Sequence, residues 1–246
     1  MKTYCLVVQY DGTEYAGFQI QPAQRTIQGE LEEALKKLGP NRIRIAGAGR
    51  TDAGVHSEGQ TVSFNDGKLT VPVDRLPYAM NALLPKDIRV VESRLEEPGF
   101  HARISALEKT YRYQIYQGEF PNVFYQRYAY WIREPLNWEA IRECLGLFIG
   151  RLDFAAFASS GSSVKTTVRT MHQVTVDTKG PLQLVRFTAD GFLYNMVRNI
   201  VGTLVDAGRG NLTSGDVLAI MESGDRRLAS AAIAPQGLVL ESVKYS

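Results

Sequence analysis

The stretch Gly49-Arg50-Thr51-Asp52-Ala53-Gly54-Val55-His56 follows the alternating run Ile43-Arg44-Ile45-Ala46, which predicts a half-buried strand. Its glycines permit positive φ and a close approach of the backbone to a ligand, and they enclose Asp52, two residues after Arg50. A nearby guanidinium favours the charged carboxylate and lowers its pKa. The stretch therefore indicates an anionic nucleophile or base on a loop at a strand end. A turn in which Asp52 caps backbone N–H groups, with Arg50 as a solvated neighbour, also fits the local pattern.

The segments around this loop follow the order β-α-β-β-α-β. Thr26 is expected to cap a helix over Ile27–Leu38, whose apolar residues share one face and which Gly39-Pro40 ends. A second helix is predicted over residues 74–84, and strands are predicted over residues 4–10, 42–48, 60–64 and 88–95. This order is that of the split βαβ, or ferredoxin-like, arrangement. It places the Asp52 loop between the two central strands.

The second half of the sequence repeats the strand and helix pattern of the first half less regularly. It predicts a strand over residues 105–116, an aromatic-rich connection over 121–132, helices over 136–148, 192–207 and 214–221, and strands over 168–176, 184–188 and 237–244. Gly208 is expected to end the helix of residues 192–207. We therefore predict an α+β fold of two ferredoxin-like lobes, residues 1–104 and 105–246. They share an extended, mainly antiparallel sheet, with the active-site cleft between them.

Composition describes an ordinary globular protein of 246 residues, 44% hydrophobic and 22% charged. Its 28 Lys and Arg against 26 Asp and Glu leave a net charge of +2, so any basic surface for nucleic acid must be local. Cys5 and Cys144 lie far apart without metal-ligand spacing, which favours a reducing compartment. No apolar run approaches the about 18 residues of a membrane span, and no signal-peptide pattern opens the sequence. We expect a cytoplasmic protein without a metal or cofactor.

Several further motifs lie in a fixed order along the chain. They are Tyr10-Asp11-Gly12-Thr13, Gly17-Phe18-Gln19, Asn81-Ala82-Leu83-Leu84-Pro85, Phe100-His101-Ala102-Arg103, Lys109-Thr110-Tyr111-Arg112-Tyr113, Asn195-Met196-Val197-Arg198-Asn199-Ile200-Val201-Gly202 and Ala234-Pro235-Gln236-Gly237-Leu238. Together with the Asp52 stretch they resemble the TruA family of tRNA pseudouridine synthases over nearly the whole chain. The number and order of these motifs make the resemblance far more specific than one motif would.

The resemblance implies the two-lobed fold and an isomerisation of uridine to pseudouridine in the anticodon stem-loop of tRNA, around positions 38 to 40. It also implies a homodimer, with tRNA as the partner. The uracil is detached from C1′ and rejoined through C5, which requires no redox equivalent, nucleotide energy or metal. Asp52 would be the nucleophile; whether it attacks C1′ or C6 of the nucleotide stays open.

Three further residues receive roles from the resemblance. Tyr111 corresponds to the tyrosine that stacks on the flipped base, whereas Tyr113 is expected to be packing. Arg198 corresponds to the arginine that pairs with the catalytic aspartate; its alternative is a guanidinium that snorkels off the helix edge. Arg50 corresponds to an RNA-contacting arginine, or else forms a simple ion pair. His56 is expected to stiffen the motif turn.

Two other classes of function compete with this one. A non-catalytic protein that binds or folds tRNA could use the same fold, but the joint presence of Asp52, Tyr111 and Arg198 argues against it. An aspartate-based hydrolase needs a second acid to share a proton with the first. No comparable motif recurs in the sequence to supply that acid.

Overall fold

The computed structural model describes residues 2–161 and 164–245. Within it, Met1–Leu107 and Val239–Ser246 form one unit, and Glu108–Leu238 form the other. The sequence-based division assigned the closing strand to the second lobe, whereas in the structure that strand belongs with the first unit. Within that unit, Val239 and Leu240 lie beside His56 and Ser57 in parallel register.

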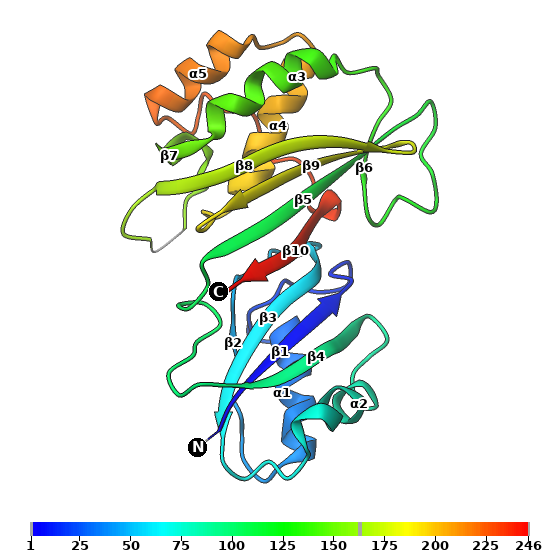
Figure 1. Cartoon of the computed structure of the whole chain (residues 1–246). Helices are drawn as coiled ribbons and strands as arrows, with labels where there is room; N and C mark the ends of the chain where they lie inside the picture. Colours follow the sequence, from blue (N-terminus) through cyan, green and yellow to red (C-terminus); the bar gives the residue numbers. More distant parts are fainter. Residues whose placement is uncertain (1, 162–163, 246) are drawn as a thin grey trace. The chain divides into compact units, whose positions relative to one another are not determined.

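The first unit is a mainly antiparallel sheet with two helices against it (Figure 1). Strand β1 is flanked by β3 and β4, antiparallel to both. The short β2 and the closing β10 each pair with β3, at different points along it. The β4-β1-β3-β2 order is that of the predicted split βαβ arrangement. The elements are β1 (Lys2–Tyr10), α1 (Ile27–Leu38), β2 (Ala46–Gly47), β3 (His56–Asp66), the 3-10 turn η1 (Val73–Arg75), α2 (Leu76–Asn81), β4 (Ile88–Glu96) and β10 (Leu238–Lys244).

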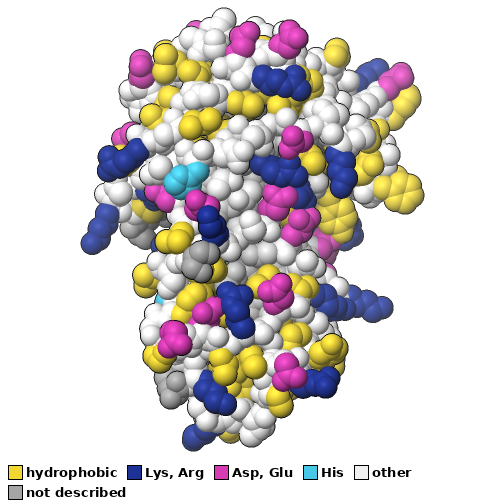
Figure 2. Space-filling view, in the orientation of Figure 1, with side chains coloured by type: hydrophobic (Ala, Val, Ile, Leu, Met, Phe, Trp, Pro, Cys, Tyr) yellow, Lys and Arg dark blue, Asp and Glu magenta, His cyan; other side chains and the backbone are white. Residues whose placement is uncertain are grey.

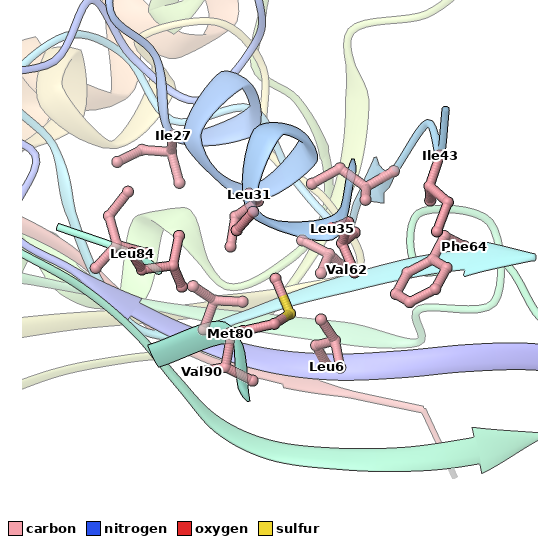
Figure 3. Packing of buried hydrophobic residues seen from close by; sticks show 14 of the residues in the cluster. Leu6, Ile27, Leu31, Leu35, Ile43, Val62, Phe64, Met80, Leu84 and Val90 are labelled. Atoms are coloured by element: carbon pink, nitrogen blue, oxygen red, sulfur yellow. The ribbon is translucent and has the colours of Figure 1, made fainter. Parts of the chain in front are cut away.

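Helix α1 follows its sequence signals from end to end. The Thr26 side chain accepts a hydrogen bond from the Gly29 N–H at 3.3 Å, which satisfies one of the unpaired donors of the first turn. The apolar face of the helix carries Ile27, Leu31 and Leu35, all buried. Figure 3 shows this face against side chains from β1, β3, β4 and α2, among them Leu6, Val62, Val90 and Met80. Burial of this face holds the helix on the sheet.

The strand predicted over residues 42–48 was wrong in its extent, because β2 is only Ala46–Gly47. Side chains of α1 bond to the backbone groups that a longer β2 would have needed for pairing with a neighbouring strand. Glu32 accepts from the Ile45 N–H at 3.2 Å, and Gln28 donates to the Ile45 carbonyl at 3.3 Å. Glu32 also pairs with Arg44 at 3.0 Å. Residues 42–45 therefore alternate as predicted, but the backbone of Ile45 is hydrogen-bonded by side chains of α1 and not by a neighbouring strand.

The helix predicted over residues 74–84 is split into η1 and the shorter α2. Asn81 ends α2, and its side-chain amide binds the backbone of Val90 in β4 twice. Its Nδ2 donates to the Val90 carbonyl and its Oδ1 accepts from the Val90 N–H, both at 2.8 Å. This pair ties the end of the helix to the sheet edge.

The second unit has a four-strand antiparallel path β5-β9-β8-β7, to which β6 adds in parallel beside β5. Helices α3, α4 and α5 lie on one face of this sheet (Figure 1). The α+β class and the mainly antiparallel pairing are as predicted. The elements are β5 (Glu108–Gln117), β6 (Tyr130–Ile132), α3 (Trp138–Leu145), η2 (Gly146–Phe148), β7 (Gly150–Asp153), η3 (Ala155–Phe157), β8 (Val168–Lys179), β9 (Leu182–Ala189), α4 (Met196–Gly208), α5 (Ser214–Ser223) and η4 (Pro235–Gly237).

Helix α4 and strand β7 of this unit differ from the prediction. Helix α4 begins at Met196 rather than at residue 192, because Asn195 adopts a left-handed conformation with φ of 57° and stops the helix from extending backward. Gly208 is the last helical residue rather than the stop that follows it. Strand β7 was missed, since four residues without clear alternation carry little strand signal; pairing with β8 makes it a strand.

Candidate active site

The Asp52 loop connects β2 to β3 and turns at Gly54. The Val55 N–H donates to the backbone carbonyl of Asp52 at 3.1 Å, and Gly54 has a φ of 77°. That conformation is open to glycine and unfavourable for other residues. Asp52 is partly exposed and Arg50 is exposed, between buried Ala48 and Val55. The loop therefore presents these two charged residues at the surface while its ends are anchored in the core.

The segment after β1 lies directly against this loop. The Phe18 N–H donates to the Thr51 carbonyl at 2.9 Å. A methyl group at Gly17 would lie 2.8 Å from the Thr51 carbonyl oxygen, and one at Gly12 would lie 2.0 Å from the Val55 carbonyl oxygen. These contacts give a physical reason for both glycine-containing motifs near the N-terminus. Each glycine lets its backbone touch the backbone of the Asp52 loop.

His56 joins the same two segments, as expected from the sequence. Its Nδ1 accepts a hydrogen bond from the Gly12 N–H at 3.1 Å and lies 3.2 Å from a carboxylate oxygen of Asp11. These two contacts connect the start of β3 to the segment that follows β1. The residue is 3% exposed. These contacts support the expectation that His56 stiffens the motif turn.

Tyr10 and Gln60 also hold the loop. From the sequence, Tyr10 was named only as part of a motif, and Gln60 was not singled out. Gln60 donates to the Gly49 carbonyl at 2.8 Å and accepts from the Gly49 N–H at 3.3 Å. The hydroxyl of Tyr10 bonds to the Thr51 hydroxyl at 2.8 Å. Burial raises the pKa of Tyr10 to about 12, although hydrogen bonds with Thr51 and Gln60 oppose the rise. The hydroxyl is therefore protonated at neutral pH. A polar residue in a strand pattern carries no signal for such a contact.

Tyr111 and Tyr113 occupy the same face of β5, in the second unit. Tyr111 is 7% exposed, and its ring meets the edge of Phe192 at 5.0 Å between centroids and an angle of 83°. Tyr113 is fully buried and donates its hydroxyl proton to the Ala234 carbonyl at 2.6 Å. The expectation that Tyr113 is packing is confirmed. Tyr111 is the one of the pair that keeps some exposed surface.

Arg198 lies in the first turn of α4, and its side chain is half-buried. Its Nε donates to the Ile233 carbonyl at 2.7 Å, and its Nη1 donates to the Asn195 side chain at 2.9 Å. The Ile233 N–H in turn donates to the Arg198 carbonyl at 3.2 Å. These bonds fix the guanidinium between the start of the helix and the segment that leads into η4. It is a positioned charge, because two of its nitrogens are held by groups of fixed geometry.

Ion pairs engage some of the other basic residues. Arg209 lies 2.5 Å from Glu134, and Arg44 pairs with Glu32 as described above. On the face that Figure 2 presents, Lys and Arg side chains are interspersed with Asp and Glu. Among residues 2–161 and 164–245, no group of three or more His, Cys, Asp or Glu could hold a metal ion. No helix in this described part of the chain is long and apolar enough to cross a membrane.

Comparisons with known proteins identify the family of this chain. Residues 6–103 and 145–246 match the family described as tRNA pseudouridine synthase. The tRNA pseudouridine synthase A of Bacillus subtilis (strain 168) is 43% identical over 248 residues, which cover 100% of this chain and 99% of the relative. That of Syntrophomonas wolfei is 45% identical over 240 residues, 98% of this chain and 96% of the relative. The tRNA pseudouridine synthase A of Acetivibrio thermocellus is 40% identical over 247 residues, 100% of each chain.

These matches define the class of protein as an isomerase that acts on tRNA. The chain belongs to the tRNA pseudouridine synthase family. The family expected from the order of the sequence motifs is thereby confirmed.

Proposed function

We propose that this protein converts uridine to pseudouridine in the anticodon stem-loop of tRNA, around positions 38 to 40, with Asp52 as the nucleophile. In the reaction the C1′–N1 bond breaks and a C1′–C5 bond forms, and the hydrogen lost from C5 is balanced by one gained at N1. The reaction is an isomerisation, so atoms and electrons balance without a co-reactant. The names of the relatives support the substrate, and the sequence motifs support the role of Asp52.

One observation carries the assignment of Asp52, namely the anchoring of its loop. The backbone on either side of Asp52 is bound at Thr51 by Phe18 and at Val55 by the turn, while the residue itself stays partly exposed. A nucleophile has to reach its target atom with little freedom of position, because correct placement removes much of the barrier. A rigid loop that leaves one carboxylate accessible meets that requirement.

The remaining roles follow the family resemblance. Tyr111 stacks on the extruded uracil, Arg198 keeps Asp52 ionised, and Arg50 contacts RNA. Base flipping requires a flat surface for the extruded base, and Tyr111 has a ring braced by Phe192. An arginine can orient a carboxylate and favour its charged form, and the guanidinium of Arg198 is already held by two hydrogen bonds.

Replacing Asp52 with Asn tests the proposal. Asn keeps the size and polarity of the side chain but removes the nucleophile, so we expect near-complete loss of pseudouridine with tRNA binding within a few-fold of the parent. Asp74→Asn is the matched control, since Asp74 is an exposed aspartate of the same unit, and it should turn over normally. Substantial turnover by Asp52→Asn contradicts the assignment, and loss of tRNA binding instead points to a structural turn.

We also propose that the protein acts as a homodimer in the cytoplasm, as the resemblance implies. Its two free cysteines are buried, in keeping with a reducing compartment. The connection between β5 and β6 exposes Phe120, Val123 and Phe124 by 70 to 83%, and exposed apolar clusters are typical of interaction surfaces. Light scattering on the parent and on Phe124→Ser tests the dimer, since a parent of monomer mass contradicts it.

A further inference from the structure

The side-chain amide of Gln60 takes the place of one backbone hydrogen-bonded pair next to the pairing of β2 with β3. The two strands pair up to the Ala48 N–H, which donates to the Thr61 carbonyl at 2.8 Å. At Gly49 the backbone leaves β3 to form the Asp52 loop. The Gln60 amide fills this gap by binding both the N–H and the carbonyl of Gly49. A side-chain amide carries the same donor and acceptor as a peptide group, so the loop keeps strand-like pairing for one more residue.

The donors and acceptors of these hydrogen bonds also connect Gln60 to Thr51, two residues after Gly49. The Gly49 N–H can only donate, so the Gln60 atom facing it is Oε1, and Nε2 faces the Gly49 carbonyl. The second hydrogen of Nε2 points to the Tyr10 hydroxyl oxygen at 3.3 Å. Because that oxygen accepts from Gln60, the Tyr10 proton is available for the Thr51 hydroxyl at 2.8 Å. A chain of hydrogen bonds thus runs from Gln60 through the Tyr10 hydroxyl, which also bonds Ser57, to Thr51, next to Asp52.

We infer that Gln60 and Tyr10 are positioning residues for the reaction, which set the backbone of Gly49 and Thr51 and thereby the place of the Asp52 side chain. The inference rests on the proposed role of Asp52. Gln60 is fully buried and Tyr10 is 4% exposed, so neither can exchange these bonds for water. A buried amide that is fully bonded favours one loop conformation over others, since any alternative leaves a polar group unsatisfied.

The decisive variant is Tyr10→Phe, which keeps the ring and removes only the hydroxyl. Tyr4→Phe is its matched control. Tyr4 is also a buried tyrosine of β1, and it stacks on Phe64, away from the loop. We expect the single-turnover rate of Tyr10→Phe to fall about ten- to a hundredfold, because displacement of a reacting group by about 1 Å costs a factor of that order. The Kd for tRNA should match that of Tyr4→Phe.

Gln60→Met adds a second, independent measurement. Methionine fills a similar volume without the two polar atoms, so the loss of rate should again appear with tRNA affinity unchanged. Because both residues act through one chain, the double variant should be about as slow as Gln60→Met alone. If the rate losses of the two single variants multiply in the double variant, the inference that both residues act through one chain of hydrogen bonds is overturned. So does a Tyr10→Phe protein that turns over at the parental rate.

The inference and the proposed function fail in different ways. Asp52→Asn is measured in the same series. Inactive Asp52→Asn with fully active Tyr10→Phe overturns the positioning role and leaves the nucleophile in place. Active Asp52→Asn overturns the proposed function itself. A rate loss in Tyr10→Phe that is matched by Tyr4→Phe, or by an equal loss of tRNA affinity, shows a general structural effect and also overturns the inference.

Discussion

Replacing Gly12 with Ala should move the Asp52 loop without unfolding the protein. The added methyl carbon would lie 2.0 Å from the Val55 carbonyl oxygen, whereas such atoms do not approach within 3.0 Å. Either the loop or the segment at Gly12 must therefore shift by about 1 Å, which is the difference between the two distances. A shift of that size costs catalysis about a hundredfold, or about 2.7 kcal/mol in barrier height. Overpacking of this kind costs about 1–3 kcal/mol of stability.

Single-turnover formation of pseudouridine and thermal unfolding measure the two effects of Gly12→Ala separately. The control is Gly146→Ala, since a methyl group at Gly146 meets nothing within 4 Å and that residue has an ordinary helical φ of −61°. The control should keep the parental rate and stability. A Gly12→Ala protein with parental rate and Tm would refute the claim that close backbone contact at Gly12 places the Asp52 loop.

Three further outcomes are expected. Tyr111→Ala should weaken productive tRNA engagement about ten- to a hundredfold, as the loss of about 1–3 kcal/mol of stacking requires, and Tyr111→Phe should still bind; equal losses in both would show that the hydroxyl matters more than the ring. Under the proposed role of Arg198, Arg198→Lys should slow turnover and shift the acid limb of the pH–rate profile upward, because Asp52 would be harder to keep ionised; full activity contradicts that role. Burial alone would raise the pKa of Asp66, but hydrogen bonds such as that from Asn41 outweigh burial and lower the pKa. The stability that Asp66 contributes is therefore present above its unfolded pKa and is lost as pH falls through its folded pKa. In Asp66→Asn the free energy of unfolding should fall less steeply toward acid pH, and an unchanged slope would contradict the lowered pKa of Asp66.

Sequence by itself determined the elements whose signals are local. Helix α1 begins and ends as predicted because its cap, Thr26, and the apolar spacing of Ile27, Leu31 and Leu35 act within one segment. The hairpin of β8 and β9 and the split βαβ order were predicted for the same reason, since alternation and turn residues depend only on neighbours in sequence. The motifs likewise identified the family without any coordinates.

Only the tertiary structure decided which partner each backbone group takes. Residues 42–45 alternate like a strand, yet the backbone of Ile45 is bound by Glu32 and Gln28 of α1. Gln60 sits in β3 without distinction in the sequence, yet its amide closes the ladder at Gly49. The physical reason is common to both cases. Every buried peptide group needs a hydrogen-bond partner, and an amide or carboxylate side chain from a distant segment can supply it as well as a neighbouring strand.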